Sequence, residues 1–467
     1  MRRVVVAGAG MAAVRLAAEV RRHDPAGERV AVTLVGDEPH PPYNRVLLST
    51  VVGGGLALPA TRLPVPAGVT VRLGLSVTGI DRQAREVVLS DGSRQPYDAL
   101  VLATGAEPHV PDLDDAPDTP GSTAFRTWDD CARIVAAAGP GTPVAVLGGG
   151  LLGLETARGL AARGCLVTVV HPVGHVLDSH VDPMASRLLR RALADQGVEF
   201  RLGVPAVRHL PGDGLKLADG GHVAAEFVVV TAGVRPRTGL ARAAGLAVDG
   251  GVLVDDVLRT SDPRIHAIGD CARHHSGAAG LVRAAYDQAA VLAARLTGAD
   301  PAARYRGTPT VGRLKTAGAD LTFLGDVHPD PAADHPAGVE VVCVQDAARG
   351  RYAKLVLRDG KMSGAILLGL PDAAATVIQL FDTGAVVPAD RLAVALGRAL
   401  PPPAGISDGA PVCRCNSVSK ADLVAAWRAG AHDVPALATA TRATTGCGGC
   451  REQVAALATS LDDQEGP

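Results

Sequence analysis

Four cysteines near the end of the chain form two close pairs, Cys413-Arg-Cys415 and Cys447-Gly-Gly-Cys450. Four thiolates in two short segments can surround a tetrahedral zinc ion or the two irons of a small iron-sulfur cluster. Glycines around the second pair let backbone amides face the sulfurs and stabilise their negative charge. The spacing alone fits a structural zinc site and a redox cluster equally well, so both stay open at this point.

A nucleotide site is indicated by glycines that follow a short apolar run at the start of the chain. Gly8, Gly10 and Ala13 form a G-x-G-x-x-A pattern. The first glycine permits a tight turn, the second lets the backbone approach a pyrophosphate, and the small third residue lets a helix pack on a strand. Asp37 and Glu38 follow the next apolar run, where a carboxylate can accept hydrogen bonds from ribose hydroxyls. We therefore expect a bound dinucleotide here rather than a bare turn.

The pattern recurs as a full G-x-G-x-x-G made by Gly148, Gly150 and Gly153, with Glu155 in the helix that should follow. His171 ends the next apolar run, where an acidic residue would favour NAD and an arginine would favour the 2′-phosphate of NADP. A neutral imidazole can accept a ribose bond, a protonated one can meet a phosphate, and a plain surface histidine is an equal alternative. We expect NAD(P)H at this site, with NADH slightly favoured.

Two dinucleotide sites in one chain limit the kinds of reaction that the protein could catalyse. One nucleotide is normally a hydride donor, and the other, in this paired arrangement, is a bound flavin. Hydride transfer between stacked cofactors needs no general acid, so we assign no catalytic side chain. The remaining cysteines are dispersed and lack a redox-active pair, which disfavours a disulfide reductase. We expect them to be small buried residues: Cys131, Cys165, Cys271 and Cys343.

Several segments resemble those of flavoprotein reductases that have two dinucleotide-binding domains and a glutathione-reductase-like fold. These segments are GAGMAA at the start, LATGAEP at 102–108, TAGVRP at 231–236 and IGDCA at 268–272. The resemblance implies that Thr104 and Gly105 mark a chain crossing near FAD. It also implies that Asp270, after Gly269, bonds the ribityl chain of FAD, and that Gly233 belongs to the NAD(P)H site.

The C-terminal segment is similar to the bacterioferritin-associated-ferredoxin-like module, which implies that Cys413, Cys415, Cys447 and Cys450 hold a 2Fe-2S cluster. The order of parts and the segment GDEPHPPYNRVLLS resemble the assimilatory nitrate and nitrite reductase branch. In that branch Arg45 would lie near the FAD phosphates, with a solvated surface arginine as the alternative. Nitrite reductase large subunits continue into sirohaem domains, and no further cysteines follow here for them.

The elements that must position these residues are short buried strands, each followed by a helix or a small residue, as in doubly wound α/β sheets. We expect strands at 30–35, 100–103, 166–170, 227–231 and 265–268, and a hairpin turn at Asp359-Gly360. The expected units are an FAD-binding domain at 1–113 and 236–307, an NAD(P)H-binding domain at 114–235, a small α+β domain at 308–400, a linker at 401–410 and a small helical 2Fe-2S domain at 411–460.

Composition excludes several other functions. The 467 residues include 46 Lys and Arg against 48 Asp and Glu, which gives nucleic acid binding no electrostatic support. Aromatic residues make up only 3%, too few for base-stacking platforms. No uncharged apolar run reaches the roughly 18 residues that a membrane helix needs. Without an export signal, we expect a cytoplasmic protein with reduced thiols.

These observations lead to one principal hypothesis. The chain is expected to be an electron-transfer subunit that oxidises NAD(P)H and feeds a separate assimilatory nitrate reductase through FAD and a 2Fe-2S cluster. The alternatives are the electron-donating part of a split nitrite reductase, and a ferredoxin or rubredoxin reductase. A different class is a flavin-bearing interaction or sensor protein in which the four cysteines hold structural zinc.

Overall fold

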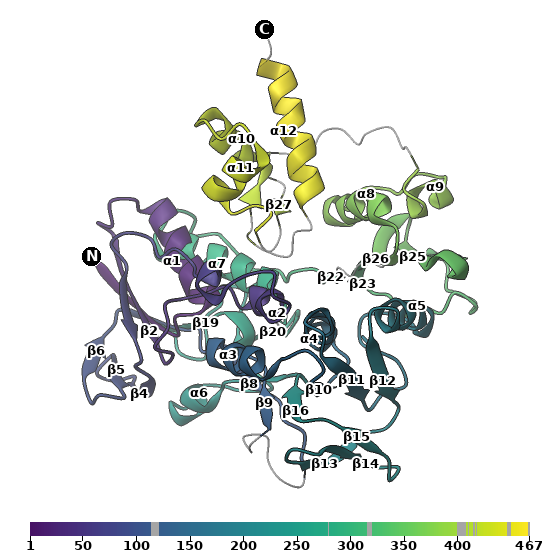
Figure 1. Cartoon of the computed structure of the whole chain (residues 1–467). Helices are drawn as coiled ribbons and strands as arrows, with labels where there is room; N and C mark the ends of the chain where they lie inside the picture. The colour runs from purple at the N-terminus through teal and green to yellow at the C-terminus, as the bar shows by residue number, and fades with distance from the viewer. Residues whose placement is uncertain are drawn as a thin grey trace.

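The protein is described by a computed structural model of the full chain (Figure 1). The description covers residues 1–113, 121–278, 280–314, 320–398, 408–409, 411–413, 416, 418–445 and 450–465. The Pro-rich segment expected to be a linker lies almost entirely outside the described residues. In the part of the chain that is described, no helix is long and apolar enough to cross a membrane.

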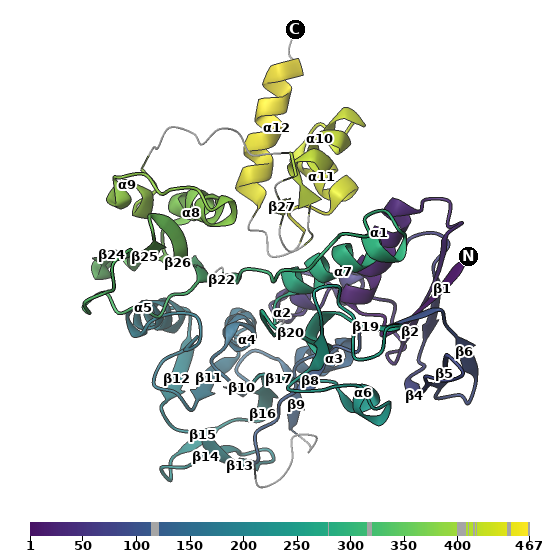
Figure 2. The ribbon, with the colours of Figure 1, turned by 180° about the vertical axis from the view of Figure 1, so that it is seen from behind.

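The first large sheet is wholly parallel, with the strand order β19-β7-β1-β2-β3. Its strands are β1 (Arg2–Ala7), β2 (Val30–Gly36), β3 (Thr70–Leu73), β7 (Ala99–Leu102) and β19 (Ile265–Ala267). The valines at positions 4–6 are fully buried because helices cover the faces of a parallel sheet. Figure 2 shows two of these helices, α1 (Met11–His23) and α7 (Val282–Leu296), side by side.

The second large sheet repeats this design, with the strand order β12-β11-β10-β16-β9 and parallel pairing throughout. Its strands are β9 (Ser122–Ala124), β10 (Pro143–Leu147), β11 (Leu166–His171), β12 (Val198–Leu202) and β16 (Phe227–Val230). The flanking helices are α3 (Trp128–Ala137), α4 (Leu151–Ala162) and α5 (Pro183–Ala194). The strand at 166–170 and its neighbours, expected from the apolar runs, are confirmed within one or two residues.

The chain forms four strands of the first sheet, then all strands of the second sheet, and then adds β19 to the first sheet. Strand β19 pairs with β7 although the whole second sheet lies between them in sequence. At the crossing, β8 (Ala106–Pro108) pairs antiparallel with β17 (Val234–Pro236). The predicted α/β architecture with two Rossmann-like units is therefore confirmed, while the residue boundaries of the units stay a prediction.

Short strands and helices complete these two units. Three small sheets are β4 (Val77–Asp81) with β5 (Glu86–Leu89) and β6 (Arg94–Pro96); β13 (Ala206–Leu210) with β14 (Gly214–Leu217) and β15 (His222–Ala224); and β18 (Val252–Val254) with β20 (Ala272–His274) and β21 (Gly277–Ala278). The short helices are η1 (Arg45–Leu47), α2 (Leu48–Val52), η2 (Leu58–Thr61), α6 (Gly239–Ala243) and η3 (Gly269–Cys271).

The small α+β domain is one antiparallel sheet with the strand order β22-β23-β26-β25-β24. Its strands are β22 (Val311–Leu314), β23 (Leu321–Gly325), β24 (Val339–Asp346), β25 (Arg351–Arg358) and β26 (Lys361–Leu368), joined by η4 (Ala347–Arg349) and followed by α8 (Pro371–Thr383) and α9 (Arg391–Ala395). The predicted hairpin turn is confirmed: Asp359 and Gly360 have φ values of 49° and 71°, as a two-residue turn between twisted strands requires.

A buried polar network attaches this small domain to the second large sheet. The ammonium group of Lys354 in β25 is 2.8 Å from the main-chain oxygen of Val327 and 3.4 Å from the Asp182 carboxylate. The Tyr352 hydroxyl donates to the same carboxylate at 2.5 Å, and Asp182 also caps helix α5. Because the Lys354 side chain is only 2% exposed, its charge depends on Asp182 for compensation.

The C-terminal unit is small and mostly helical. Its elements are β27 (Pro411–Cys413), β28 (Val418–Ser419), α10 (Lys420–Arg428), α11 (Val434–Thr441) and α12 (Arg451–Glu465). Trp427, Leu423, Leu437 and Val454 are buried at its centre. In both views this unit lies next to α1 and α7 of the first large unit (Figures 1 and 2).

Candidate functional site

The first glycine loop forms a cradle at the end of β1. Gly8 has a φ of +123°, and a Cβ atom there would lie 2.2 Å from the main-chain oxygen of Ala103, so only glycine fits. Gly10 caps helix α1, and nothing lies within 4 Å of the position that its Cβ would take. Ala13 is fully buried against the sheet. The loop thus leaves free amides and open space at a helix N-terminus, which fits a pyrophosphate.

The carboxylates that follow β2 are both engaged in ion pairs. Asp37, with its side chain 48% exposed, lies 2.8 Å from the guanidinium of Arg237. Glu38 accepts a 2.6 Å hydrogen bond from the Tyr43 hydroxyl and pairs with Arg45. Asp37 is therefore the more accessible of the two acidic groups. The Arg45 guanidinium is not freely solvated, because it also donates to the main-chain oxygen of Arg126 at 3.0 Å.

Asp270 lies opposite an arginine that the sequence reasoning missed. The Arg126 guanidinium is 2.6 Å from the Asp270 carboxylate, and both side chains are about a quarter exposed, at 21% and 26%. The Nε atom of Arg126 is buried without a hydrogen-bond partner in the described structure, so the group retains donor capacity. Arg126 precedes a helix and belongs to no recognisable sequence motif. Its position beside Asp270 is set by the fold.

The segment around Thr104 closes the cradle. The Thr104 hydroxyl donates to the main-chain oxygen of Arg237 at 3.0 Å, and the Arg237 amide donates to Gly105 at 3.0 Å. On the other side, Gly269 adopts a φ of +76° and donates its amide to the Gln288 side chain at 2.7 Å. The residues assigned to FAD from the sequence thus gather around the carboxyl ends of β1, β2, β7 and β19.

The second cradle has the same geometry, with glycine also at the third position. At Gly148, φ is +126°, and an added Cβ would meet the main-chain oxygen of Thr231 at 2.5 Å. At Gly153, a Cβ would be 2.0 Å from the Gly148 oxygen, so the third glycine is required for helix α4 to approach β10. Gly150 caps α4 and has open space where its Cβ would be. The geometry again fits a pyrophosphate.

Other predicted residues of the second site lie around this loop. The His171 ring is 11% exposed; its Nδ1 accepts from the Gly149 amide at 3.2 Å, and its Nε2 is 3.3 Å from Asp178. The His171 ring therefore packs against the glycine loop and is not a solvated surface histidine. Glu155 accepts from the Ser49 hydroxyl at 2.7 Å, which joins α4 to α2. Gly233, with a φ of +106°, has open space beside it.

Two of the four clustered cysteines are described. Cys413 ends β27 and Cys450 immediately precedes α12, and both are buried. The Thr444 amide donates to the Cys450 sulfur at 3.2 Å, a contact that stabilises a thiolate. Cys415 and Cys447 lie outside the described residues. The described donor set, buried sulfur facing a backbone amide, fits an anionic metal-thiolate centre.

The dispersed cysteines do not form a redox centre. Cys131, Cys165 and Cys271 are buried as expected, and burial raises the pKa of Cys131 to about 12. Burial likewise raises the pKa of Cys271, which keeps its thiol protonated. The expectation was wrong for Cys343, which is exposed because β24 is the edge strand of its sheet. Its sulfur lies 3.2 Å from the Tyr352 hydroxyl.

The cysteine-bearing unit touches the unit that carries the first cradle. Arg442, which follows α11, donates to the main-chain oxygen of Arg62 at 3.0 Å. Arg62 in turn forms a β-bridge with Tyr43, the residue that bonds Glu38. A short run of contacts therefore connects the cysteine unit to the edge of the first cradle.

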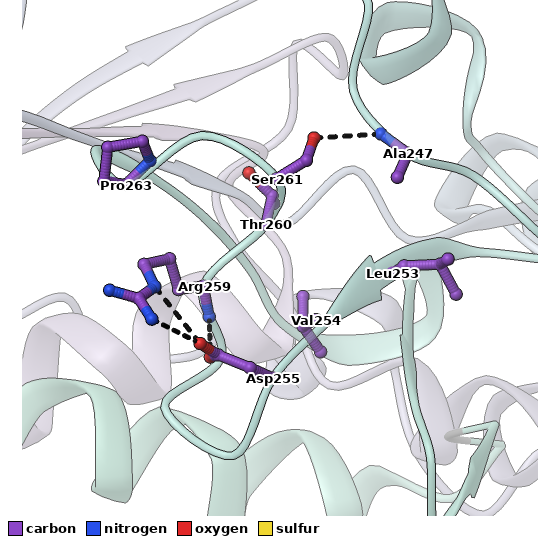
Figure 3. Close-up of a pocket in the computed structure, with 8 residues that line it drawn as sticks. All are labelled: Ala247, Leu253, Val254, Asp255, Arg259, Thr260, Ser261 and Pro263. Carbon is purple, nitrogen blue, oxygen red and sulfur yellow. Dashed lines mark hydrogen bonds and ion pairs between the residues drawn. The ribbon is translucent and has the colours of Figure 1, made fainter.

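Figure 3 shows a surface hollow on the first unit. It is lined by Ala247, Leu253, Val254, Asp255, Arg259, Thr260, Ser261 and Pro263. The Asp255 carboxylate accepts hydrogen bonds from the Arg259 side chain at 2.9 and 3.1 Å. None of the residues predicted for cofactor binding lines this hollow.

Comparisons with known proteins agree with this geometry. The chain matches the model of the pyridine nucleotide-disulphide oxidoreductase family over residues 2–289. Residues 311–382 match the rubredoxin NAD+ reductase C-terminal domain, and residues 411–459 match the BFD-like 2Fe-2S binding domain. These matches confirm the predicted FAD-dependent NAD(P)H oxidoreductase architecture and support FAD, NAD(P)H and a 2Fe-2S cluster as its cofactors.

Two relatives from Bacillus subtilis (strain 168) are similar over nearly the whole chain. An NAD(P)H nitrite reductase is 33% identical over 97% of this chain and 57% of its own length. An assimilatory nitrate reductase electron transfer subunit is 32% identical over 99% of this chain and 60% of its own length. The chain thus spans less than two thirds of either relative. A solved structure, the covalent putidaredoxin reductase-putidaredoxin complex, has a TM-score of 0.74 and 26% identity, over 84% of this chain and 95% of that one.

Proposed function

Because the chain belongs to the pyridine nucleotide-disulphide oxidoreductase family, we propose that it oxidises NAD(P)H and delivers single electrons to a separate assimilatory nitrate or nitrite reductase. FAD accepts a hydride as an electron pair and can release the electrons singly, and a 2Fe-2S cluster carries one electron at a time. The chain combines a site for each of these cofactors, which a simple nucleotide-binding protein would not need.

The observation that carries the proposal is the contact between the cysteine-bearing unit and the FAD-type unit. Arg442 reaches the main-chain oxygen of Arg62, and Thr444, two residues later, donates its amide to the Cys450 sulfur. The contact holds the C-terminal unit, with Cys450, beside the unit from which it would receive electrons. A zinc ion that only stabilised the fold of the C-terminal unit would not require that unit to lie beside the FAD-type unit.

We assign the cofactor sites as follows. The FAD site comprises Gly8, Gly10, Ala13, Asp37, Glu38, Arg45, Thr104, Gly105, Gly269 and Asp270, with Arg126 added from the structure. The NAD(P)H site comprises Gly148, Gly150, Gly153, Glu155, His171 and Gly233, and the cluster is held by Cys413, Cys415, Cys447 and Cys450. The guanidinium groups of Arg45 and Arg126 would offset the charge of the FAD phosphates, and the Asp270 carboxylate would accept hydrogen bonds from the ribityl chain.

The partner is proposed from the chemistry and from the named relatives. Both Bacillus relatives belong to nitrogen-oxide reduction, and one is named as an electron transfer subunit. We propose a cytoplasmic location and the domain boundaries expected from the sequence on the same basis. The nitrate reductase is placed first because the relative from that system is itself named as an electron transfer subunit.

The decisive experiment is an acceptor comparison with anaerobically purified protein. NADH and NADPH are added separately, flavin absorbance is followed at high time resolution, and the reduced cluster is detected by EPR. Transfer is then assayed with purified nitrate reductase catalytic subunit, nitrite reductase, ferredoxin and rubredoxin. Cys447→Ser should abolish the EPR signal but not flavin bleaching, whereas the matched control Cys165→Ser should preserve both.

A second candidate is favoured by one observation. The small domain matches the rubredoxin NAD+ reductase C-terminal domain. If rubredoxin or ferredoxin accepts electrons rapidly while both nitrogen-oxide reductases do not, the chain is a reductase of that kind. Zinc without iron or acid-labile sulfide in the purified protein would contradict the electron-transfer proposal altogether.

A further inference from the structure

Three side chains outside the cofactor sites converge at the end of a small parallel strand pair. Strand β18 pairs with β20 so that Val254 is opposite His274. Asp256 follows β18 by two residues, and His275 follows β20 directly. One carboxylate and two imidazoles therefore meet just beyond the ends of the two strands. Neither the nucleotide loops nor the cysteine pairs contain any of these residues.

Two of the separations between the potential ligand atoms are close to those that one metal ion imposes. The Nε2 atom of His274 is 3.1 Å from Oδ1 of Asp256, and the Nδ1 atom of His275 is 3.5 Å from the same oxygen. The ligand atoms of all three residues lie within 4.8 Å of one another. Ligands at about 2.0–2.1 Å from a tetrahedral zinc ion stand about 3.3 Å apart. The distances from Asp256 to the two histidines therefore fit a single ion, and the two imidazoles lie within reach of the same position.

The surroundings hold one ligand rigidly and leave the others accessible. The His274 side chain is 0% exposed, with the Tyr305 ring against it at 5.0 Å between centroids. Its Nδ1 accepts from the Ser276 amide at 3.3 Å and is 2.7 Å from the Ser276 hydroxyl, while Nε2 bonds Asp256. A metal on Nε2 would place the proton on Nδ1, where the Ser276 hydroxyl can accept it in exchange for the longer amide contact. The side chains of His275 and Asp256 are 72% and 46% exposed, so an ion can enter from solvent.

The neighbouring carboxylate shows why Asp256 is the available one. Asp255 accepts from the side chain and the amide of Arg259 at 2.9 to 3.1 Å (Figure 3). It also accepts from the Val257 amide at 3.0 Å. Its oxygens are therefore already satisfied. Within the described residues, the ionisable partners of the Asp256 carboxylate are the two histidines. Adjacent aspartates in one loop thus have different roles.

We propose that Asp256, His274 and His275 form a binding site for a divalent transition metal of the zinc class. Two imidazoles and one carboxylate suit zinc, nickel or cobalt and are poor ligands for calcium and magnesium, which prefer oxygen. Three protein ligands leave a fourth position for water or for a ligand supplied from outside. The ion would fasten the loop after β18 to β20, the strand that follows η3 and Asp270. Tyr305, whose amide donates to the Asp256 main chain at 2.8 Å, would be held in the same unit.

The test uses full-length protein with its 2Fe-2S cluster intact, so that the clustered cysteines are already occupied. The protein is incubated with Zn²⁺, freed of unbound metal, and analysed for zinc and iron. Wild-type protein should retain one more zinc ion per chain than His275→Ala, with the iron content equal in both. His275 is the preferred variant because its side chain is 72% exposed, so its loss should not disturb the core. Calorimetry should give a zinc affinity at least about tenfold weaker in His275→Ala and in Asp256→Asn.

A matched control distinguishes this site from adventitious binding. His222 and Asp213 form another exposed histidine-aspartate pair, 3.4 Å apart, and within the described residues no third histidine, cysteine or carboxylate lies close enough to complete a metal site with them. His222→Ala should therefore bind zinc as wild-type protein does. Zinc should also raise the melting temperature of wild-type and His222→Ala protein but not of His275→Ala. Equal zinc retention and equal affinity in wild-type protein and His275→Ala would overturn the proposal, whatever the fate of the electron-transfer function.

Discussion

Arg442 donates a hydrogen bond to the main-chain oxygen of Arg62 at 3.0 Å, across 380 residues of sequence. Arg442 ends helix α11 in the left-handed conformation, with a φ of 63°. This conformation turns the chain toward Thr444, whose amide bonds the Cys450 sulfur. The contact therefore joins the described part of the C-terminal unit to the FAD-type unit through the Arg442 side chain, and it can be tested by changing that side chain.

We expect Arg442→Asn to weaken the docking of the C-terminal unit without unfolding it. Asparagine tolerates the left-handed conformation but cannot reach Arg62. Loss of one such hydrogen bond should cost about 0.5–1.5 kcal/mol, which lowers the equilibrium constant for docking about two- to thirteenfold. Hydrogen exchange in the 418–445 region should speed up and flavin-to-cluster electron transfer should slow down. Arg428→Gln, which changes an exposed arginine of the same unit, should leave both rates as in wild-type protein.

The second glycine loop offers two substitutions with opposite consequences. Gly150→Ala meets no atom within 4 Å, so the protein should keep its melting temperature. The new methyl group faces the space left for the pyrophosphate, so the Kd for NADH should rise at least about tenfold. Gly153→Ala brings a methyl group to 2.0 Å from the Gly148 oxygen and should instead lower stability, by about 1–3 kcal/mol. Equal effects of both variants on stability would contradict this geometry.

Arg126 should matter for the retention of FAD. Its guanidinium lies 2.6 Å from Asp270 and keeps a buried Nε without a partner in the described structure. Arg126→Gln removes a charge-assisted donor from the first cradle, so the Kd for FAD should rise about tenfold. Flavin content after gel filtration and direct titration of the apoprotein measure the effect. Arg94→Gln breaks an ion pair with Glu86, 3.2 Å away on a separate small sheet, and should retain FAD as wild-type protein does.

Stability should fall in mild acid because of His266 in β19. Burial lowers the pKa of His266 from 6.5 to about 4, so the unfolded chain binds more protons than the folded chain between these values. The stabilising contribution is complete above pH 6.5 and is lost as the pH falls toward 4. From about pH 7 to about pH 5 the loss should amount to about 2 kcal/mol. Denaturant titrations at several pH values should show a shallower pH dependence in His266→Gln. An unchanged slope would assign the acid sensitivity to other groups.

Local patterns predicted the elements and the cradles because each depends on a few consecutive residues. Gly8 and Gly148 must be glycine on steric grounds, and the apolar runs that precede them can only be buried strands of a parallel sheet. The hairpin at Asp359-Gly360 was predicted for the same reason, since the turn residues themselves set its backbone angles. The cysteine spacing likewise indicated a metal centre, and the resemblance of its flanking residues to a known module favoured iron.

Relationships between distant residues were decided by the tertiary structure. No sequence pattern brings Arg126 to Asp270, and none gathers Asp256 with His274 and His275. Cys343 is exposed, against expectation, because its strand lies at the edge of its sheet. Which strand lies at the edge depends on how the strands pair. The physical reason is common to these cases. Steric limits on the backbone act within a few residues, whereas the packing of sheets and helices determines which distant side chains meet.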